Sequence, residues 1–125
     1  MKDRVYISDL RVKCIIGTKA SERKVKQTLI INVAMECDLG PSGESDRLED
    51  TVNYMKIRNR IMSRVESSRF FLIERIAREV AEICLADKLV KLVRVRVDKP
   101  GAIPAAISAG VEIERKRRAA RGKKR

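Results

Sequence analysis

The chain has 125 residues, of which 44% are hydrophobic, a composition typical of one folded domain with a modest core. It contains no apolar run near the roughly 18 residues that span a bilayer and no signal peptide, which favours a cytoplasmic protein without a membrane partner. The formal net charge is +12. Histidine is absent, and its absence excludes His-ligated metals, Ser–His or Cys–His nucleophile pairs and histidine general bases.

Two strands are expected near the start of the chain. Apolar residues alternate over residues 5–16, and a change of phase at Ser8 and Asp9 predicts a β-bulge. A polar connecting loop covers residues 17–27. A second alternation over residues 29–39 predicts a long strand antiparallel to the first, and the Gly-Pro-Ser-Gly segment after it ends the strand.

Two helices are predicted next. Asp50 or Thr51 suits the N-cap of the first helix. Its apolar stripe at helical spacing consists of Tyr54, Ile57, Ile61 and Val65. A polar segment interrupts the pattern at residues 66–69. The second helix then presents an apolar face made of Leu72, Ile76, Val80, Ile83 and Cys84.

The chain ends in two more predicted strands, residues 93–99 and 107–113, joined by a loop through Pro104. The order strand–strand–helix–helix–strand–strand indicates an α+β domain, a four-stranded antiparallel sheet with two helices on one face. An open sheet of this kind leaves two unpaired edges. Edge-to-edge joining of such sheets into a closed oligomeric barrel would remove them, so we expect self-association.

The C-terminus is the source of most of the charge. Eight basic and no acidic residues lie between 115 and 125, so residues 1–115 are expected to form a single domain and residues 116–125 a disordered basic tail. Such a tail either tethers nucleic acid or another anionic surface, or only aids solubility. No aromatic residue interleaves the charges, so any nucleic-acid binding is expected to be non-specific.

The cysteines favour a reduced protein without a metal site. Cys14, Cys37 and Cys84 are odd in number and widely spaced, and each falls in phase with apolar neighbours. No CxxC pair, dinucleotide-binding glycine pattern or phosphate-binding loop is present. We therefore expect core thiols, and neither a metal nor a cofactor.

Lys99 ends the predicted strand 93–99 and shares the phase of Val93, Val95 and Val97, so it is expected on their buried face. An amine at the edge of an apolar face loses water, which lowers its pKa and makes a neutral proton acceptor accessible near pH 7. The alternative is a lysine that merely ends the strand and extends its amine to solvent.

Three further polar groups stand where a packed surface is expected: Glu22 in the first loop, Tyr54 on the first helix, and Glu74 beside the apolar segment 70–73. Each also has a simple structural role, as loop charge, as a core phenol with a hydrated hydroxyl, or as a complement to the helix dipole. Together with Lys99 they suit a flat heterocycle with a donor edge and proton transfer at its side chain.

At these positions the sequence resembles the dihydroneopterin aldolase family of folate biosynthesis. The matching segments cover nearly all of the chain before the tail: residues 10–17, 20–23, 50–54, 71–75, 99–102 and 110–115. The resemblance implies the tunnelling fold, in which such sheets close into a barrel. It also implies a homo-oligomer, a tetramer ring or an octamer, with active sites between neighbouring subunits.

The resemblance further implies cleavage of dihydroneopterin to hydroxymethyl-dihydropterin and glycolaldehyde. In this assignment Glu74 anchors the pterin, assisted by the backbone at Ile73, and Lys99 is the proton donor and acceptor. Tyr54 lies beside the reacting side chain, and Glu22 contacts the substrate or Lys99 across the subunit interface. Many relatives carry a histidine where Ile16 stands, so we expect no substrate contact from that side chain.

Two alternatives stay open. An epimerase acting on dihydroneopterin triphosphate shares much of this fold and pocket, although the segment Lys99–Ala102 resembles the aldolase more. A nucleic-acid-binding protein that uses its basic tail is the other. The domain has few aromatic residues and no aromatic pair on adjacent strands of the kind that stacks RNA bases.

Overall fold

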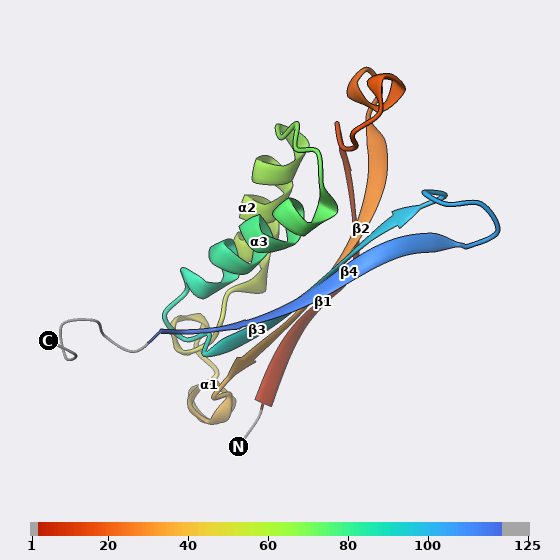
Figure 1. Ribbon diagram of the computed structural model, residues 1–125. Coiled ribbons are helices and arrows are strands. Elements are labelled where there is room, and N and C mark those ends of the chain that lie inside the picture. The colour runs from red at the N-terminus through yellow and green to blue at the C-terminus, as the bar shows by residue number, and fades with distance from the viewer. Residues whose placement is uncertain (1–2, 119–125) are drawn as a thin grey trace, which may run out of the picture.

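The computed structural model describes residues 3–118 (Figure 1). Its main elements are the strands β1 (Asp3–Cys14), β2 (Gln27–Cys37), β3 (Leu92–Pro100) and β4 (Ser108–Lys116) and the helices α2 (Tyr54–Glu66) and α3 (Ile73–Leu85). Three short helices lie in the connections: η1 (Ala20–Arg23), α1 (Gly40–Ser45) and η2 (Leu48–Asp50). The predicted order of strands and helices is confirmed.

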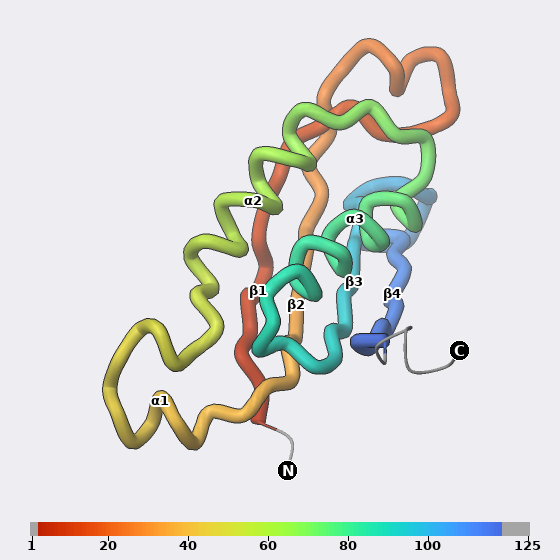
Figure 2. Tube along the Cα trace, turned by 90° about the vertical axis from the view of Figure 1, so that its left-hand side faces the viewer, coloured from red at the N-terminus to blue at the C-terminus, as the bar shows by residue number. Residues whose placement is uncertain are grey.

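The four strands form one antiparallel sheet in the order β1-β2-β3-β4, with α2 and α3 together on one face (Figures 1 and 2). Alternate residues of the strands point toward the helices and are buried against them. The residues that this packing encloses include Val12, Ile16, Leu29, Ile31, Ile61, Ile76, Val80 and Val95. β1 and β4 are the two edges of this open sheet.

The predicted bulge in the first strand is present. The register between β1 and β2 shifts between Ile7 and Leu10, and Asp9 has a φ of 52°. The side chain of Asn32 stabilises this backbone, because its Oδ1 accepts a hydrogen bond from the Asp9 amide at 2.8 Å. The bulge therefore changes the phase of β1: Ser8 and Asp9 have no paired partner in β2, and the pairing resumes at Leu10.

One expectation about local structure is wrong, and another is incomplete. The N-cap of α2 is Asn53, whose side chain accepts a hydrogen bond from the Lys56 amide at 3.2 Å, whereas Asp50 ends η2 and Thr51 is extended. The Gly-Pro-Ser-Gly segment does more than end β2, because it forms the helix α1, with Pro41 in its first turn. Proline suits that position, where its missing N–H costs no hydrogen bond.

All three cysteines are free and buried, which confirms the interpretation as core thiols. Burial raises the pKa of Cys84 to about 12. None of the helices among residues 3–118 is long and apolar enough to cross a membrane.

Lys116 and Arg117, the first two residues of the predicted tail, are part of the folded domain. Lys116 belongs to β4, and the Arg117 amide donates a hydrogen bond to the Lys91 carbonyl at 2.9 Å. The guanidinium of Arg117 also donates to the carbonyls of Leu85, Asp87 and Val90 at 2.6–3.0 Å. These carbonyls lie at the last residue of α3 and in the turn after it, so Arg117 fastens the end of β4 to the end of that helix. The rest of the predicted tail, residues 119–125, lies outside the described residues.

Replacing Arg117 by alanine should lower the free energy of unfolding by about 1–2 kcal/mol, because several carbonyls lose a charged donor. Arg118→Ala removes the same charge one residue further on and should change stability by less than about 0.5 kcal/mol. Urea denaturation of both variants measures the difference. Equal stability of the two would contradict a structural role for Arg117.

Candidate active site

The central contact of the site is an ion pair between the last strand pair and the first loop. Lys99 lies near the end of β3, on the helix-facing side with Val95 and Val97, as its phase predicts. Its Nζ donates to Glu22 Oε2 at 2.6 Å, and only 13% of the Lys99 side chain is exposed. The alternative, in which this lysine extends freely into solvent, is therefore wrong.

Glu22 is held by three donors. In addition to Lys99, the Lys19 amide donates to Oε1 at 3.2 Å and Gln27 Nε2 donates to Oε2 at 3.3 Å. The pKa of Glu22 falls from its ordinary 4.5 to about 2, first because of the Lys99 hydrogen bond and then because of Lys19 and Gln27. Glu22 is therefore a carboxylate at neutral pH and accepts the hydrogen bond from Lys99.

Gly17 leaves the space that Glu22 occupies. Its φ of +128° is a conformation that side chains rarely adopt, and an added Cβ would collide with the Glu22 carboxyl group. Gln27 completes this arrangement, because its Nε2 also donates to the Ile16 carbonyl at 2.8 Å. The side chain of Ile16 itself is fully buried in the core, so it offers no surface to a ligand.

Glu22 and Lys99 contact each other within one chain, which corrects the expected contact across a subunit interface. The two residues are separated by 77 positions in the sequence, and the loop between β1 and β2 folds back onto the end of β3 to join them. A single subunit therefore assembles this half of the site.

Glu74 lies at the same end of the domain as the Lys99–Glu22 pair. It lies in the first turn of α3, which runs away from the Lys99 end of β3 and leads back to the start of that strand (Figure 2). Ile73 packs against the core, while Glu74 is exposed and has no hydrogen bond or ion pair to another residue in the described range. Its carboxylate is thus a free acceptor beside uncapped helical N–H groups.

The apolar surroundings expected for Glu74 are absent from the single chain. Phe71 and Leu72 are more than half exposed, at 58% and 53%. Leu72 is the N-cap residue of α3 and lies outside its apolar stripe, and only Phe70 and Ile73 of this segment reach the core. Exposed apolar residues next to a free carboxylate leave a surface that another molecule can cover.

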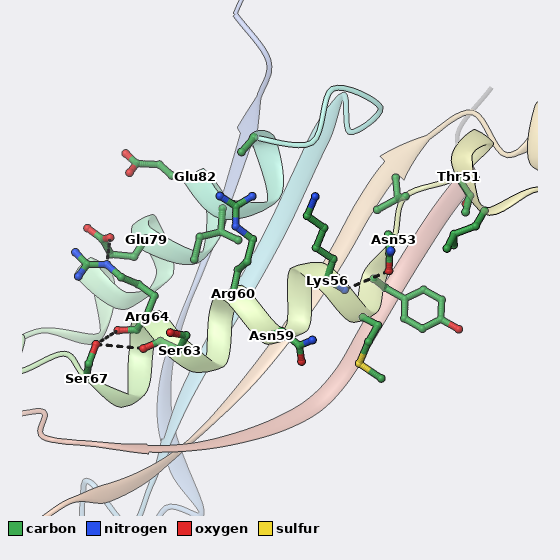
Figure 3. Close-up of a pocket in the computed structure, with 16 residues that line it drawn as sticks. Thr51, Asn53, Lys56, Asn59, Arg60, Ser63, Arg64, Ser67, Glu79 and Glu82 are labelled. Carbon is green, nitrogen blue, oxygen red and sulfur yellow. Dashed lines mark hydrogen bonds and ion pairs between the residues drawn. The ribbon is translucent and has the colours of Figure 1, made fainter.

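Tyr54 lies apart from the other three side chains. It is 59% exposed rather than part of the buried stripe of α2, which consists of Ile57, Ile61 and Val65. It lines an open groove of about 1300 Å³ along α2, into which Lys56 and Arg60 also project and which none of the other three site residues lines (Figure 3).

The distance between Tyr54 and the other site residues follows from the length of α2. Tyr54 is the first of the 13 residues of this helix, so it lies roughly 18 Å from the helix end that leads into the α3 turn. The structure therefore brings Glu22 and Lys99 together, places Glu74 at the same end, and leaves Tyr54 at the opposite end.

Arg23 is a site residue that the sequence reasoning missed. It follows Glu22 in η1, and its guanidinium donates to the carbonyls of Gly17 and Phe70 at 3.1 and 2.9 Å. The only signal in the sequence is its position next to Glu22. No group of three or more His, Cys, Asp or Glu side chains with the geometry of a metal site occurs within residues 3–118.

Comparisons with known proteins agree on one family. The family model for dihydroneopterin aldolase matches residues 5–114. The dihydroneopterin aldolase of Escherichia coli K12 is 39% identical over 90% of this chain and 93% of its own length. A solved structure of E. coli dihydroneopterin aldolase in complex with neopterin has a TM-score of 0.87 and 39% identity over 90% of this chain and 98% of that one.

Two further relatives have names other than dihydroneopterin aldolase. The chain is 42% identical to part of a folic acid synthesis protein of Dictyostelium discoideum, of which it spans only 17% of the length. It is also 32% identical to a dihydroneopterin triphosphate 2'-epimerase of Pseudomonas aeruginosa, over 88% of this chain and 89% of that protein.

The low pKa of Glu22 has a consequence for acid stability. A carboxyl group whose pKa is lower in the folded than in the unfolded state stabilises the fold above the unfolded value, and this contribution is lost as pH falls from about 4.5 toward 2. Glu22→Gln should therefore flatten the loss of stability over this range, as measured by thermal unfolding. Glu66→Gln, an exposed carboxyl group with no ion pair among the described residues, is the control and should leave the pH profile unchanged.

Proposed function

The chain belongs to the dihydroneopterin aldolase family and is a carbon–carbon lyase of folate synthesis, and we propose that Lys99, Glu22, Glu74 and Tyr54 carry out its reaction. The substrate in this proposal is dihydroneopterin, and the products are hydroxymethyl-dihydropterin and glycolaldehyde. The observation that carries the proposal is the 2.6 Å contact between Lys99 and Glu22, at the end of the domain where α3 begins with Glu74 in its first turn.

The pterin ring is held by Glu74 in this proposal. A carboxylate accepts two parallel hydrogen bonds from the ring N–H and amino group of an amino-pyrimidine edge, and such charge-assisted bonds are strong. Support comes from the absence of any competing partner for Glu74 within residues 3–118. The backbone of Ile73, in the uncapped first turn of α3, assists by contacting the ring.

For the cleavage step, the protein has to supply only groups that accept and donate protons. Lys99, directly or through a water molecule, removes the proton of the side-chain hydroxyl group. The carbon–carbon bond then breaks, its electron pair enters the ring C=N group to form an enamine, and glycolaldehyde leaves. Tyr54 helps return a proton to the enamine carbon. One proton is lost and one is gained, and the ring C=N group itself accepts the electron pair. The reaction therefore needs neither a metal nor a cofactor.

Tyr54 reaches the reacting side chain from a neighbouring copy in this proposal. Within one chain the length of α2 keeps it away from Lys99, and a second subunit that packs its α2 against the Glu74 end would close the gap. The exposed residues Phe71 and Leu72 and the unpaired edges β1 and β4 supply surfaces for such contacts. We therefore propose a homo-oligomer, a tetramer ring or an octamer, with active sites between subunits.

A dihydroneopterin triphosphate epimerase is the second candidate function, because one relative at 32% identity carries that name. An aldolase of this kind can also invert the side chain, so inversion alone does not separate the two functions. Glycolaldehyde release from dihydroneopterin, detected by mass spectrometry, decides for the aldolase. Inversion of the triphosphate without cleavage of either substrate would decide for the epimerase.

A cytoplasmic location is also part of the proposal. It is supported by the three free, buried cysteines, which suit a reducing compartment.

Lys99→Ala should lower kcat by about 10²–10⁴-fold because it removes the positioned acid and base, while neopterin still binds. Glu74→Ala should instead lose neopterin affinity first, because the ring loses its anchor. Glycolaldehyde release and calorimetric titration measure the two effects. Lys91→Ala, an exposed lysine at the other end of β3, is the control. Full activity of Lys99→Ala would refute the assignment of the base.

The separation of Tyr54 from Lys99 predicts complementation between subunits. Lys99→Ala and Tyr54→Phe should each be nearly inactive alone. When the two are co-expressed in equal amounts, random mixing should restore about a quarter of the sites, because one site takes its lysine and its tyrosine from different chains. If co-expressed subunits that form mixed oligomers stay inactive, the site does not lie between subunits.

A further inference from the structure

Arg23 joins two segments that are far apart in the sequence. Its Nη1 donates to the Gly17 carbonyl at 3.1 Å and to the Phe70 carbonyl at 2.9 Å, and its Nη2 donates to the Arg69 carbonyl. The contact is reciprocal, because Arg69 Nη2 donates to the Arg23 carbonyl at 3.2 Å. The guanidinium of Arg23 also lies over the ring of Phe71, 4.1 Å from its centroid.

The two segments carry the two parts of the proposed site. On one side, Gly17 and Arg23 flank the loop in which Glu22 reaches Lys99. On the other side, residues 69–71 lead directly into Ile73 and Glu74 at the start of α3. Arg23 is thus a connection between the acid–base pair and the turn that presents the anchoring carboxylate.

The chemistry of this contact requires an arginine. Within the described residues Arg23 has no carboxylate partner, so its donors are used on three backbone carbonyls. A guanidinium group is planar and rigid, offers five N–H donors in fixed directions and stacks on aromatic rings. Lysine has the same charge but cannot donate to three divergent carbonyls and stack on Phe71 at once.

We propose that Arg23 is a positioning residue that fixes the spacing between the Lys99–Glu22 pair and the Glu74 turn. This inference rests on the proposed function. Arg23 itself contacts neither the ring nor the reacting side chain. Its removal leaves Glu74 able to bind a planar base, while the substrate side chain is no longer held at the correct distance from Lys99.

The test compares turnover with binding of a base that has no side chain. Guanine offers the same amino-pyrimidine edge as a pterin, so it reports on Glu74 alone. In Arg23→Ala, kcat for dihydroneopterin should fall by about 10²-fold, since a displacement of 1 Å at a reacting group can cost this much. The Kd for guanine should stay within about threefold, because the anchoring residue is intact.

Three companion variants make the outcome specific. Arg23→Lys keeps the charge and should be nearly as slow as Arg23→Ala. Phe71→Leu removes the stacking but keeps an apolar side chain for the proposed subunit contact. It should give a smaller loss of kcat, and it serves as the test if Arg23→Ala does not fold. Lys24→Ala changes the next, exposed residue of the same loop and should resemble the parent chain in kcat and in guanine binding.

Each result supports or overturns the inference. Unchanged kcat in Arg23→Ala overturns it, as does full recovery of kcat in Arg23→Lys, which would show that charge alone matters. A parallel loss of guanine binding and kcat also overturns it, because Arg23 would then support only the fold. If the parent chain itself releases no glycolaldehyde, the proposed function fails instead.

Discussion

The hydrogen-bonded ion pair between Lys99 and Glu22 is the interaction on which the arrangement of the site depends. The strand alternation places the Lys99 amine on the same face as the buried valines of β3, where an unpaired charge would be costly. Glu22 satisfies this amine only because the loop between β1 and β2 folds back over the end of the sheet. Gly17 makes room for the carboxylate, and Gln27 holds it from the other side. This one contact therefore compensates the charge of Lys99 within the fold and also holds its amine in place for acid–base chemistry.

The second constraint is the length of α2. It separates Tyr54 from the Lys99 end by the whole helix, so one chain presents a binding carboxylate and an acid–base pair without the phenol. Exposed apolar residues occur at both ends of this helix, Tyr54 and Met55 at the start and Phe71 and Leu72 after its end. Because the site residues and the exposed apolar residues are divided between the two ends of α2, this surface suits a protein whose subunits complete one another's active sites. The free edges of the sheet are consistent with the same conclusion.

The fold was largely predictable from the sequence, because two-residue alternation reports directly which face of a strand is buried. The phase of Lys99 and the bulge near Asp9 followed from that pattern. Tyr54 was misplaced, because its spacing matches the apolar stripe of α2, whereas the buried part of that stripe begins at Ile57. Composition predicted disorder from residue 116 onward and could not show that Arg117 binds three carbonyls at the end of α3 and in the turn that follows it. The contacts of Arg23 with Arg69 and Phe70 could not be predicted from the sequence either, because these residues lie 46 and 47 positions away from it.

The register of the sheet places both ends of the described chain at the end of the sheet opposite to Lys99. Asp3 pairs with Cys37 and Lys116 pairs with Leu92, whereas Lys99 and Gln27 lie at the other end of their strands (Figure 1). A fluorescent label, an affinity tag or a neighbouring domain joined next to Asp3 or Lys116 would therefore begin at the end of the sheet opposite to the Lys99–Glu22 pair. A fusion at these positions would leave the acid–base pair of the same subunit unobstructed.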